Sequence, residues 1–143
     1  MRNKGDFMTL TLQFADGTTQ AALTNTTVYP SGSSSIRSYA EIYLEENVMT
    51  LAELEAWFSD VSKTSSIHFI LKNDEDSILA DEVYNNFILL TQCGKKIIQY
   101  VDSVTGTATE QMCLIVRLEQ PTYTEQLIEE MQEAYRIITE GEE

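Results

Sequence analysis

The sequence predicts one α+β domain, in which a mainly antiparallel β-sheet carries two packed amphipathic helices at about 50–60 and 122–140. Short β-branched runs bounded by turn residues indicate strands, and two stretches place apolar residues at helical spacing instead. A chain of 143 residues has the usual length of one domain. We expect roughly five to seven strands, with residues 1–7 as a disordered lead-in and 8–143 as the domain.

The first expected element is a half-buried strand over 8–14, where apolar and polar residues alternate. Asp16-Gly17 follows, and this dipeptide between strand patterns is typical of a hairpin. The return strand is predicted over 18–27. Residues 30–35, rich in Pro, Gly and Ser, are predicted to form a loop.

Residues 36–45 alternate again and predict a strand with one apolar face. The opposite face carries Tyr39 and Tyr43 between charged residues. Tyrosine combines apolar area with a polar tip and is enriched at protein interfaces. We therefore predict Tyr39 and Tyr43 as candidate protein contacts, with cross-strand packing as the alternative.

The first helix is predicted over 50–60. Thr50 and Glu53 have the spacing of a capping box, in which each side chain accepts a hydrogen bond from the other residue's amide. Trp57 lies on the apolar stripe of this helix, and we interpret it as a core residue rather than a ligand-stacking one.

A strand is then expected over 67–71, and 78–84 is predicted to form either another strand or an irregular connection. The stretch 86–118 that follows is predicted to form the centre of the sheet. That stretch holds two apolar runs separated by a turn-rich segment at 102–109. Gly-Lys-Lys at 94–96 suits a turn or a sheet edge, where lysine discourages strand association.

The second helix begins after Pro121, and Thr122 with Glu125 gives it a second capping box. Gly141 suits its C-terminal cap. Because one face is apolar, this helix must cover either its own sheet or a partner. The apolar face consists of Leu127, Ile128, Met131, Ala134, Tyr135 and Ile138.

The formal net charge is −14, which repels phosphate backbones and anionic lipid, so we expect neither nucleic-acid nor membrane binding. No apolar run reaches the ~20 residues of a membrane span, and the first residues do not form a secretory signal. Cys93 and Cys113 are too few for a disulfide framework and favour a reducing, cytoplasmic location.

Residues with the usual catalytic or metal-binding patterns are sparse. His68 is the single histidine, and no nucleophile motif accompanies it. Asp74 and Asp76 lack the glycine and terminal glutamate of a calcium loop, so we interpret them as a solvated turn. We expect no enzymatic activity, and we predict no catalytic residue, no metal site and no cofactor.

Several segments together resemble a known group of proteins. They are Phe-Ala-Asp-Gly-Thr at 14–18, Arg-Ser-Tyr-x-Glu-Ile at 37–42, Thr-Leu-x-Glu-Leu-Glu-Ala-x-Phe at 50–58, Gly-Lys-Lys at 94–96 and Val-Arg-Leu-Glu-Gln at 116–120. Over about residues 8–140 the chain resembles small uncharacterised proteins encoded in prophages of Gram-positive bacteria, often beside tail genes. The resemblance implies a virion or tail-accessory role and supplies no catalytic or binding residues.

The first functional hypothesis is a non-enzymatic structural or assembly protein of a phage-like particle, acting through protein contacts. Its expected partners are other phage structural proteins, with a second copy of the chain also open. Its expected location is the host cytoplasm during assembly, or the virion. The alternative is an acidic protein that mimics DNA and inhibits a host nucleic-acid enzyme. A third hypothesis, an enzyme, would require two converging acids with raised pKa values.

Overall fold

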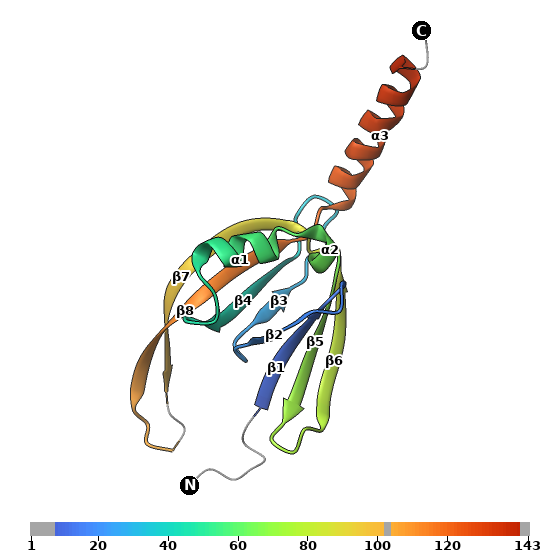
Figure 1. The fold of residues 1–143 in the computed structure, drawn as a ribbon. Helices are drawn as coiled ribbons and strands as arrows, with labels where there is room; N and C mark the ends of the chain where they lie inside the picture. The colour runs from blue at the N-terminus through green and yellow to red at the C-terminus, as the bar shows by residue number, and fades with distance from the viewer. Residues whose placement is uncertain (1–7, 102–103, 141–143) are drawn as a thin grey trace.

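The computed structural model describes residues 8–101 and 104–140 and folds them into two four-stranded antiparallel sheets and three helices (Figure 1). The predicted α+β class is confirmed, but the strands form two sheets, in the orders β2-β1-β5-β6 and β3-β4-β8-β7. The elements are β1 (Met8–Phe14), β2 (Thr19–Ala22), β3 (Thr27–Tyr29), β4 (Tyr39–Glu45), α1 (Leu51–Phe58), α2 (Val61–Thr64), β5 (Ser66–Asn73), β6 (Ile78–Asn85), β7 (Leu89–Val101), β8 (Ala108–Glu119) and α3 (Tyr123–Glu140).

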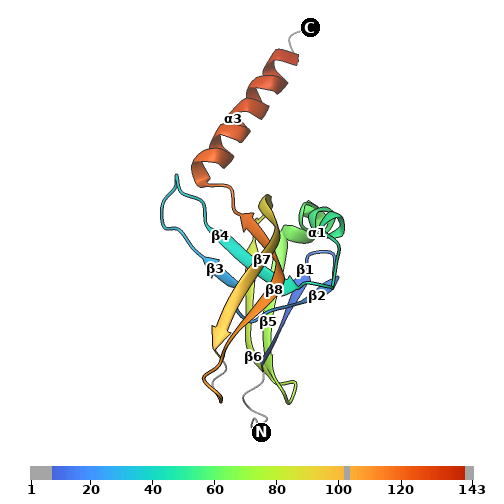
Figure 2. The same cartoon turned by 90° about the vertical axis from the view of Figure 1, so that its left-hand side faces the viewer.

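The main core lies between the two sheets and beneath α1 (Figures 1 and 2). The alternation in β1 and β4 accounts for it, because every second side chain of each strand points to the same side. Burying these side chains supplies most of the favourable free energy of folding. The fully or nearly buried members are Leu10, Leu12, Phe14, Ala40, Ile42, Leu44, Leu54, Phe58, Ile67, Phe87, Leu114, Val116 and Leu118.

Strand β8 is buried on both faces over 113–116, which explains the apolar run there, whereas Met112 at its start is exposed. Leu114 and Val116 belong to the main core. Cys113 and Ile115 point to the other side, where they form a second cluster with Tyr43. A run without alternation is expected when both faces of a strand are covered.

Helix α1 begins as predicted. Thr50 Oγ1 accepts a hydrogen bond from the Glu53 amide at 3.1 Å, and Glu53 Oε1 accepts one from the Thr50 amide at 3.0 Å. The following short helix α2, which the sequence pattern did not predict, has Asp60 as its N-cap. Trp57 packs against the core with its ring edge-to-face with Phe14, so its predicted core role is confirmed.

The predicted return strand over 18–27 is too long. Strand β2 ends at Ala22, and the chain then crosses to the second sheet, where the Leu23 amide donates to the Tyr43 carbonyl at 2.7 Å. Thr27 already belongs to β3, which pairs with β4. The segment predicted as one strand is therefore divided between β2, an edge strand of the first sheet, and the start of β3, an edge strand of the second sheet.

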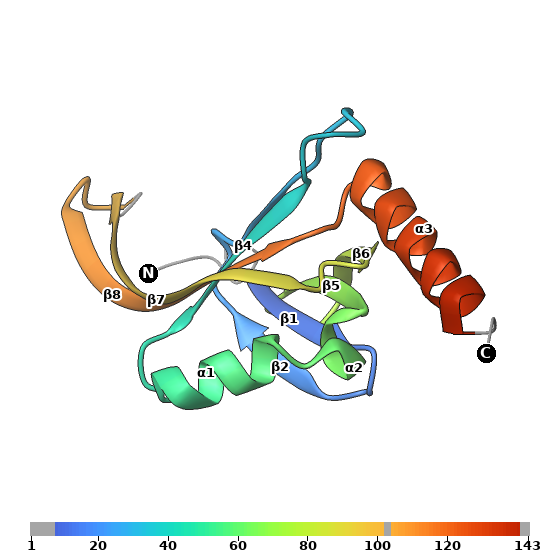
Figure 3. The ribbon, with the colours of Figure 1, turned by 90° about the horizontal axis from the view of Figure 1, so that it is seen from above.

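The stretch 86–118 also differs in part from its prediction. Strand β8 is central, but β7 is an edge strand of 13 residues that runs unbroken through Gly94 and Lys95. The prediction that Gly-Lys-Lys at 94–96 lies at a sheet edge is thus confirmed, and the other possibility, a turn at these residues, is wrong. Beyond Glu45 and Cys113, where β4 stops pairing, β7 and β8 continue as a hairpin that extends past the body (Figure 3).

Helix α3 projects from the body, so the prediction that both helices pack on the sheet is wrong for the second one (Figures 1 and 2). None of its residues is buried, and none joins either apolar cluster. The expected lead-in at 1–7 and the expected cap at Gly141 lie outside the described residues. Among the described helices, none combines the length and hydropathy that a membrane span requires.

Candidate protein-contact surface

The first turn of α3 is fixed by its own cap. The Glu125 amide donates to Thr122 Oγ1 at 3.1 Å, and the Thr122 amide donates to Glu125 Oε1 at 3.2 Å. This is the capping box that the sequence predicted, and it satisfies two amides that a helix start would leave unpaired. Thr122 is buried, so this cap residue also packs the start of the helix against the body.

Hydrogen bonds from Gln120 and Thr124 attach the start of α3 to the body. The Gln120 amide donates to the Ser38 carbonyl at 2.9 Å, and the Gln120 side-chain amide donates to the Asn85 carbonyl at 2.9 Å. The Thr124 amide reaches the Ser34 carbonyl of the 30–35 loop at 3.3 Å. The helix therefore starts from a fixed point between two loops.

Arg37 adds an ion pair to this attachment. Its Nε and Nη2 donate to the two carboxylate oxygens of Glu125 at 2.8 and 2.6 Å, and its Nη1 lies 3.3 Å from Glu119 Oε1. Such two-point pairing of a guanidinium with a carboxylate fixes orientation as well as distance. The Arg37 guanidinium and the Thr122 amide lower the pKa of the Glu125 carboxyl to about 2.

Beyond its first turn, α3 presents an uncovered apolar surface, which we call the α3 apolar face. The exposed fraction reaches 64% at Met131 and 70% at Tyr135. Contiguous exposed apolar surface of this kind marks binding sites in soluble proteins. The face consists of the six residues predicted from helical spacing: Leu127, Ile128, Met131, Ala134, Tyr135 and Ile138.

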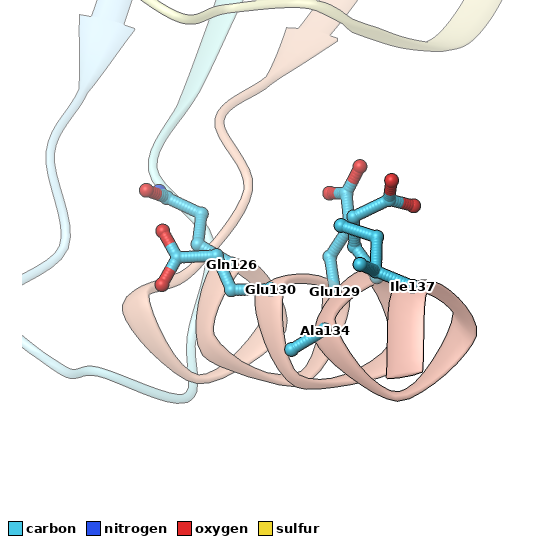
Figure 4. A pocket seen from close by; sticks show the side chains of 6 residues that line it. Gln126, Glu129, Glu130, Ala134 and Ile137 are labelled. Carbon is cyan, nitrogen blue, oxygen red and sulfur yellow. The ribbon is translucent and has the colours of Figure 1, made fainter. Parts of the chain in front are cut away.

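One side of this face is bordered by the carboxylate of Glu130, and other glutamates lie farther around the helix. Figure 4 shows a shallow groove formed entirely by α3 side chains, in which Glu129 and Glu130 extend from the helix near Ala134 and Ile137. Glu133 and Gln126 complete it. The opposite side carries Gln132 next to Ile128, Met131 and Tyr135. The α3 apolar face thus has one acidic border and one uncharged polar border.

The two tyrosines predicted as contacts lie elsewhere. Tyr39 is half-buried, stacked on Tyr29 with ring centroids 4.8 Å apart and covered by the Arg117 guanidinium at 3.7 Å. Tyr43 is only 6% exposed. Burial and a hydrogen bond to the Glu41 carboxylate raise the pKa of Tyr43 to about 12. Cross-strand packing, the alternative interpretation, therefore describes both side chains, and Tyr43 has little surface to offer a partner.

The remaining singled-out residues form separate local contacts. His68 lies 3.2 Å from Asp81 across β5 and β6, and the Asp76 side chain lies 3.5 Å from Lys72. Cys113 is buried, and Cys93 is half-buried. Within 8–101 and 104–140, no three His, Cys, Asp or Glu side chains gather closely enough to hold a metal ion.

Among the described residues, the carboxyl groups with clearly shifted pKa values all shift in the same direction. Burial of Glu119 raises its pKa, but hydrogen bonds from Thr91 and Arg37 outweigh this effect and lower it overall. The others are Asp16, Glu53, Glu125 and Glu133, and each has a lowered pKa because a cation or an amide stabilises its charged form. A carboxyl that donates a proton would need the opposite shift.

Arg37 is the residue of this surface that sequence reasoning missed. The alternation over 36–45 puts Arg37 on the polar face of the predicted strand, and no local pattern indicates that its partner Glu125 lies 88 residues away. Comparison with protein-family models, curated proteins and solved structures gives no match. The function is therefore argued from the geometry of α3 and the surface around it.

Proposed function

We propose that this chain is a non-enzymatic assembly protein that binds another protein through α3. The observation that carries the proposal is a helix fixed at its base and uncovered along its length. An amphipathic helix that lays its apolar face into a groove is a common mode of protein recognition. The resemblance to prophage proteins supports a phage-like particle, in its tail or beside it, as the setting.

The energetics of α3 support a contact role. Most of the stability of helices in proteins comes from packing an amphipathic face against the rest of the fold, and α3 gains nothing from core packing because none of its residues is buried. Its cap, the Arg37–Glu125 pair and the Arg136–Glu140 pair at 2.7 Å hold it instead. These contacts preserve a preformed binding element, which reduces the entropy lost on association.

The alternative, a mimic of DNA, requires a spaced stripe of free carboxylates on one surface. Three of the α3 glutamates already pair with arginines of the same chain: Glu125 with Arg37, and Glu133 and Glu140 with Arg136. An exposed apolar face is also not needed by a mimic of a phosphate backbone. Both observations favour the protein-contact proposal.

A photocrosslinking scan in the cells that naturally make the chain tests this proposal. A benzoylphenylalanine in place of Tyr135 probes α3, and the same residue in place of Tyr39 probes the site predicted from sequence. We expect crosslinks to another polypeptide from position 135 and few from position 39. Crosslinks from position 39 alone, or from neither position, would contradict a contact role for α3.

A further inference from the structure

The chemistry of the α3 apolar face also indicates what kind of partner covers it. Resting on the proposed function, we propose that α3 docks into an apolar groove bordered by lysine or arginine on a different protein, rather than against a second copy of this chain. Three features of the structure carry this inference. They are the width of the α3 apolar face, the negative charge of α3, and the pairing of the described cations with carboxylates of the same chain.

The face is wider than a two-stranded coiled coil needs. Leu127, Met131, Ala134 and Ile138 follow the alternating four- and three-residue steps of such a seam. Ile128 and Tyr135 lie beside this seam and widen the apolar arc to roughly 120° of the helix circumference. A paired helix would leave these two side chains in water, whereas a concave groove covers them.

The charge of α3 opposes pairing with itself. Five glutamates and one arginine give the helix a net charge of −4, within a chain whose net charge is −14. Glu129 and Glu130 have no cationic partner among the described residues. Two copies side by side would bring like charges together along an apolar interface, and such juxtaposition disfavours association. A basic border on the partner would instead neutralise Glu130, the carboxylate beside Ala134 at the border of the face.

Among the residues that the structure describes, almost no free cation is left to supply that border to a second copy. Lys96 is the one described cation without a carboxylate partner, and its Nζ lies 5.9 Å from the centre of the Tyr43 ring. The other described cations already contact carboxylates of the same chain: Arg37, Lys63, Lys72, Lys95, Arg117 and Arg136. The pairing of these described cations therefore favours a basic groove on another protein.

The test combines the photocrosslinker at position 135 with a pair of charge variants. Glu129→Gln with Glu130→Gln removes the two unpaired α3 carboxylates. Asp74→Asn with Glu75→Gln makes the same change in net charge in the β5–β6 turn, at the end of the body away from α3 (Figure 1). Crosslinked products are identified by mass spectrometry, and purified chains are weighed by light scattering at low and high salt.

We expect a crosslink to a different protein, and its yield should fall about threefold to tenfold in the Glu129/Glu130 variant but not in the Asp74/Glu75 variant. Both variants should remain monomeric. A crosslink to a second copy, or self-association that strengthens when Glu129 and Glu130 are neutralised, would overturn the inference. A crosslink to another protein whose yield is the same in both charge variants as in the natural chain would overturn the inference, but it would leave the proposed function standing. The absence of any crosslink from α3 would overturn both.

Discussion

The guanidinium of Arg37 donates two hydrogen bonds to the carboxylate of Glu125, from Nε at 2.8 Å and from Nη2 at 2.6 Å. This pair connects the start of α3 to the segment that leads into β4. The same arginine reaches Glu119 at the end of β8. The pair therefore joins three separate parts of the chain at one place. We infer that it sets the direction in which α3 leaves the body.

Arg37→Gln should loosen α3 without unfolding the sheets, because the pair lies at the surface and the core does not depend on it. The ¹⁵N relaxation of the backbone amides of α3 measures this. In the natural chain these amides should tumble with the body, and in Arg37→Gln they should move more freely. Arg117→Gln is the matched control, because Arg117 also contacts Glu119 but not α3. Equal rigidity of α3 in both variants would refute the role of Arg37.

The Glu125 carboxyl should titrate at about 2, well below its ordinary value of 4.5. Because its pKa is lowered in the folded chain, its contribution to stability is fully present above the unfolded value. That contribution is lost as the pH falls through about 2. The carboxyl ¹³C shift of Glu125 reports the midpoint. In Arg37→Gln the midpoint should move toward 4.5, and an unchanged midpoint would show that the arginine is not the cause.

Leu54→Ala and Leu51→Ala make the same chemical change at a buried and at an exposed position of α1. Leu54 is fully buried, so its truncation should lower the free energy of unfolding by about 2–5 kcal/mol through lost burial and a cavity. Leu51 is 45% exposed, and its truncation should change that free energy by less than about 1 kcal/mol. Urea unfolding of the two variants provides the comparison. Equal effects would mean that α1 does not cover the core as described.

The two cysteines should react slowly in the folded chain. Burial raises the pKa of the Cys113 thiol and of the Cys93 thiol, so each has less reactive thiolate than an exposed cysteine. Cys113 is fully buried and its Sγ donates to the Lys96 carbonyl at 3.3 Å. Labelling with a thiol reagent at mildly alkaline pH should modify Cys93 first and Cys113 only after unfolding. Rapid labelling of Cys113 in the folded chain would contradict its placement in β8.

The features predicted correctly from sequence depend on residues close together in the chain. The Thr50–Glu53 and Thr122–Glu125 capping boxes each span three residues, and the strand over 8–14 follows from alternation alone. Such local patterns are set by the geometry of a helix start or of a strand. They can be predicted without knowing what surrounds them.

The features that were missed depend on distant parts of the chain. The division into two sheets follows from pairings such as Gln13 with His68 and Ile42 with Val116, which no local pattern encodes. The apolar face of α3 has the same sequence pattern whether it covers a sheet or a partner. Its projection is determined by Arg37, Gln120 and the loops they contact, so only the folded structure reveals it.

The central claim is that another protein covers the α3 apolar face in the cell, and oxidative footprinting of the methionines tests it most directly. Met131 is 64% exposed, and Met8, at 49%, lies on β1 and serves as the internal control. We predict that Met131 oxidises readily in the purified chain and is protected in the cells that naturally make it, while Met8 reacts similarly in both. Equal oxidation of Met131 in the two settings would contradict the claim.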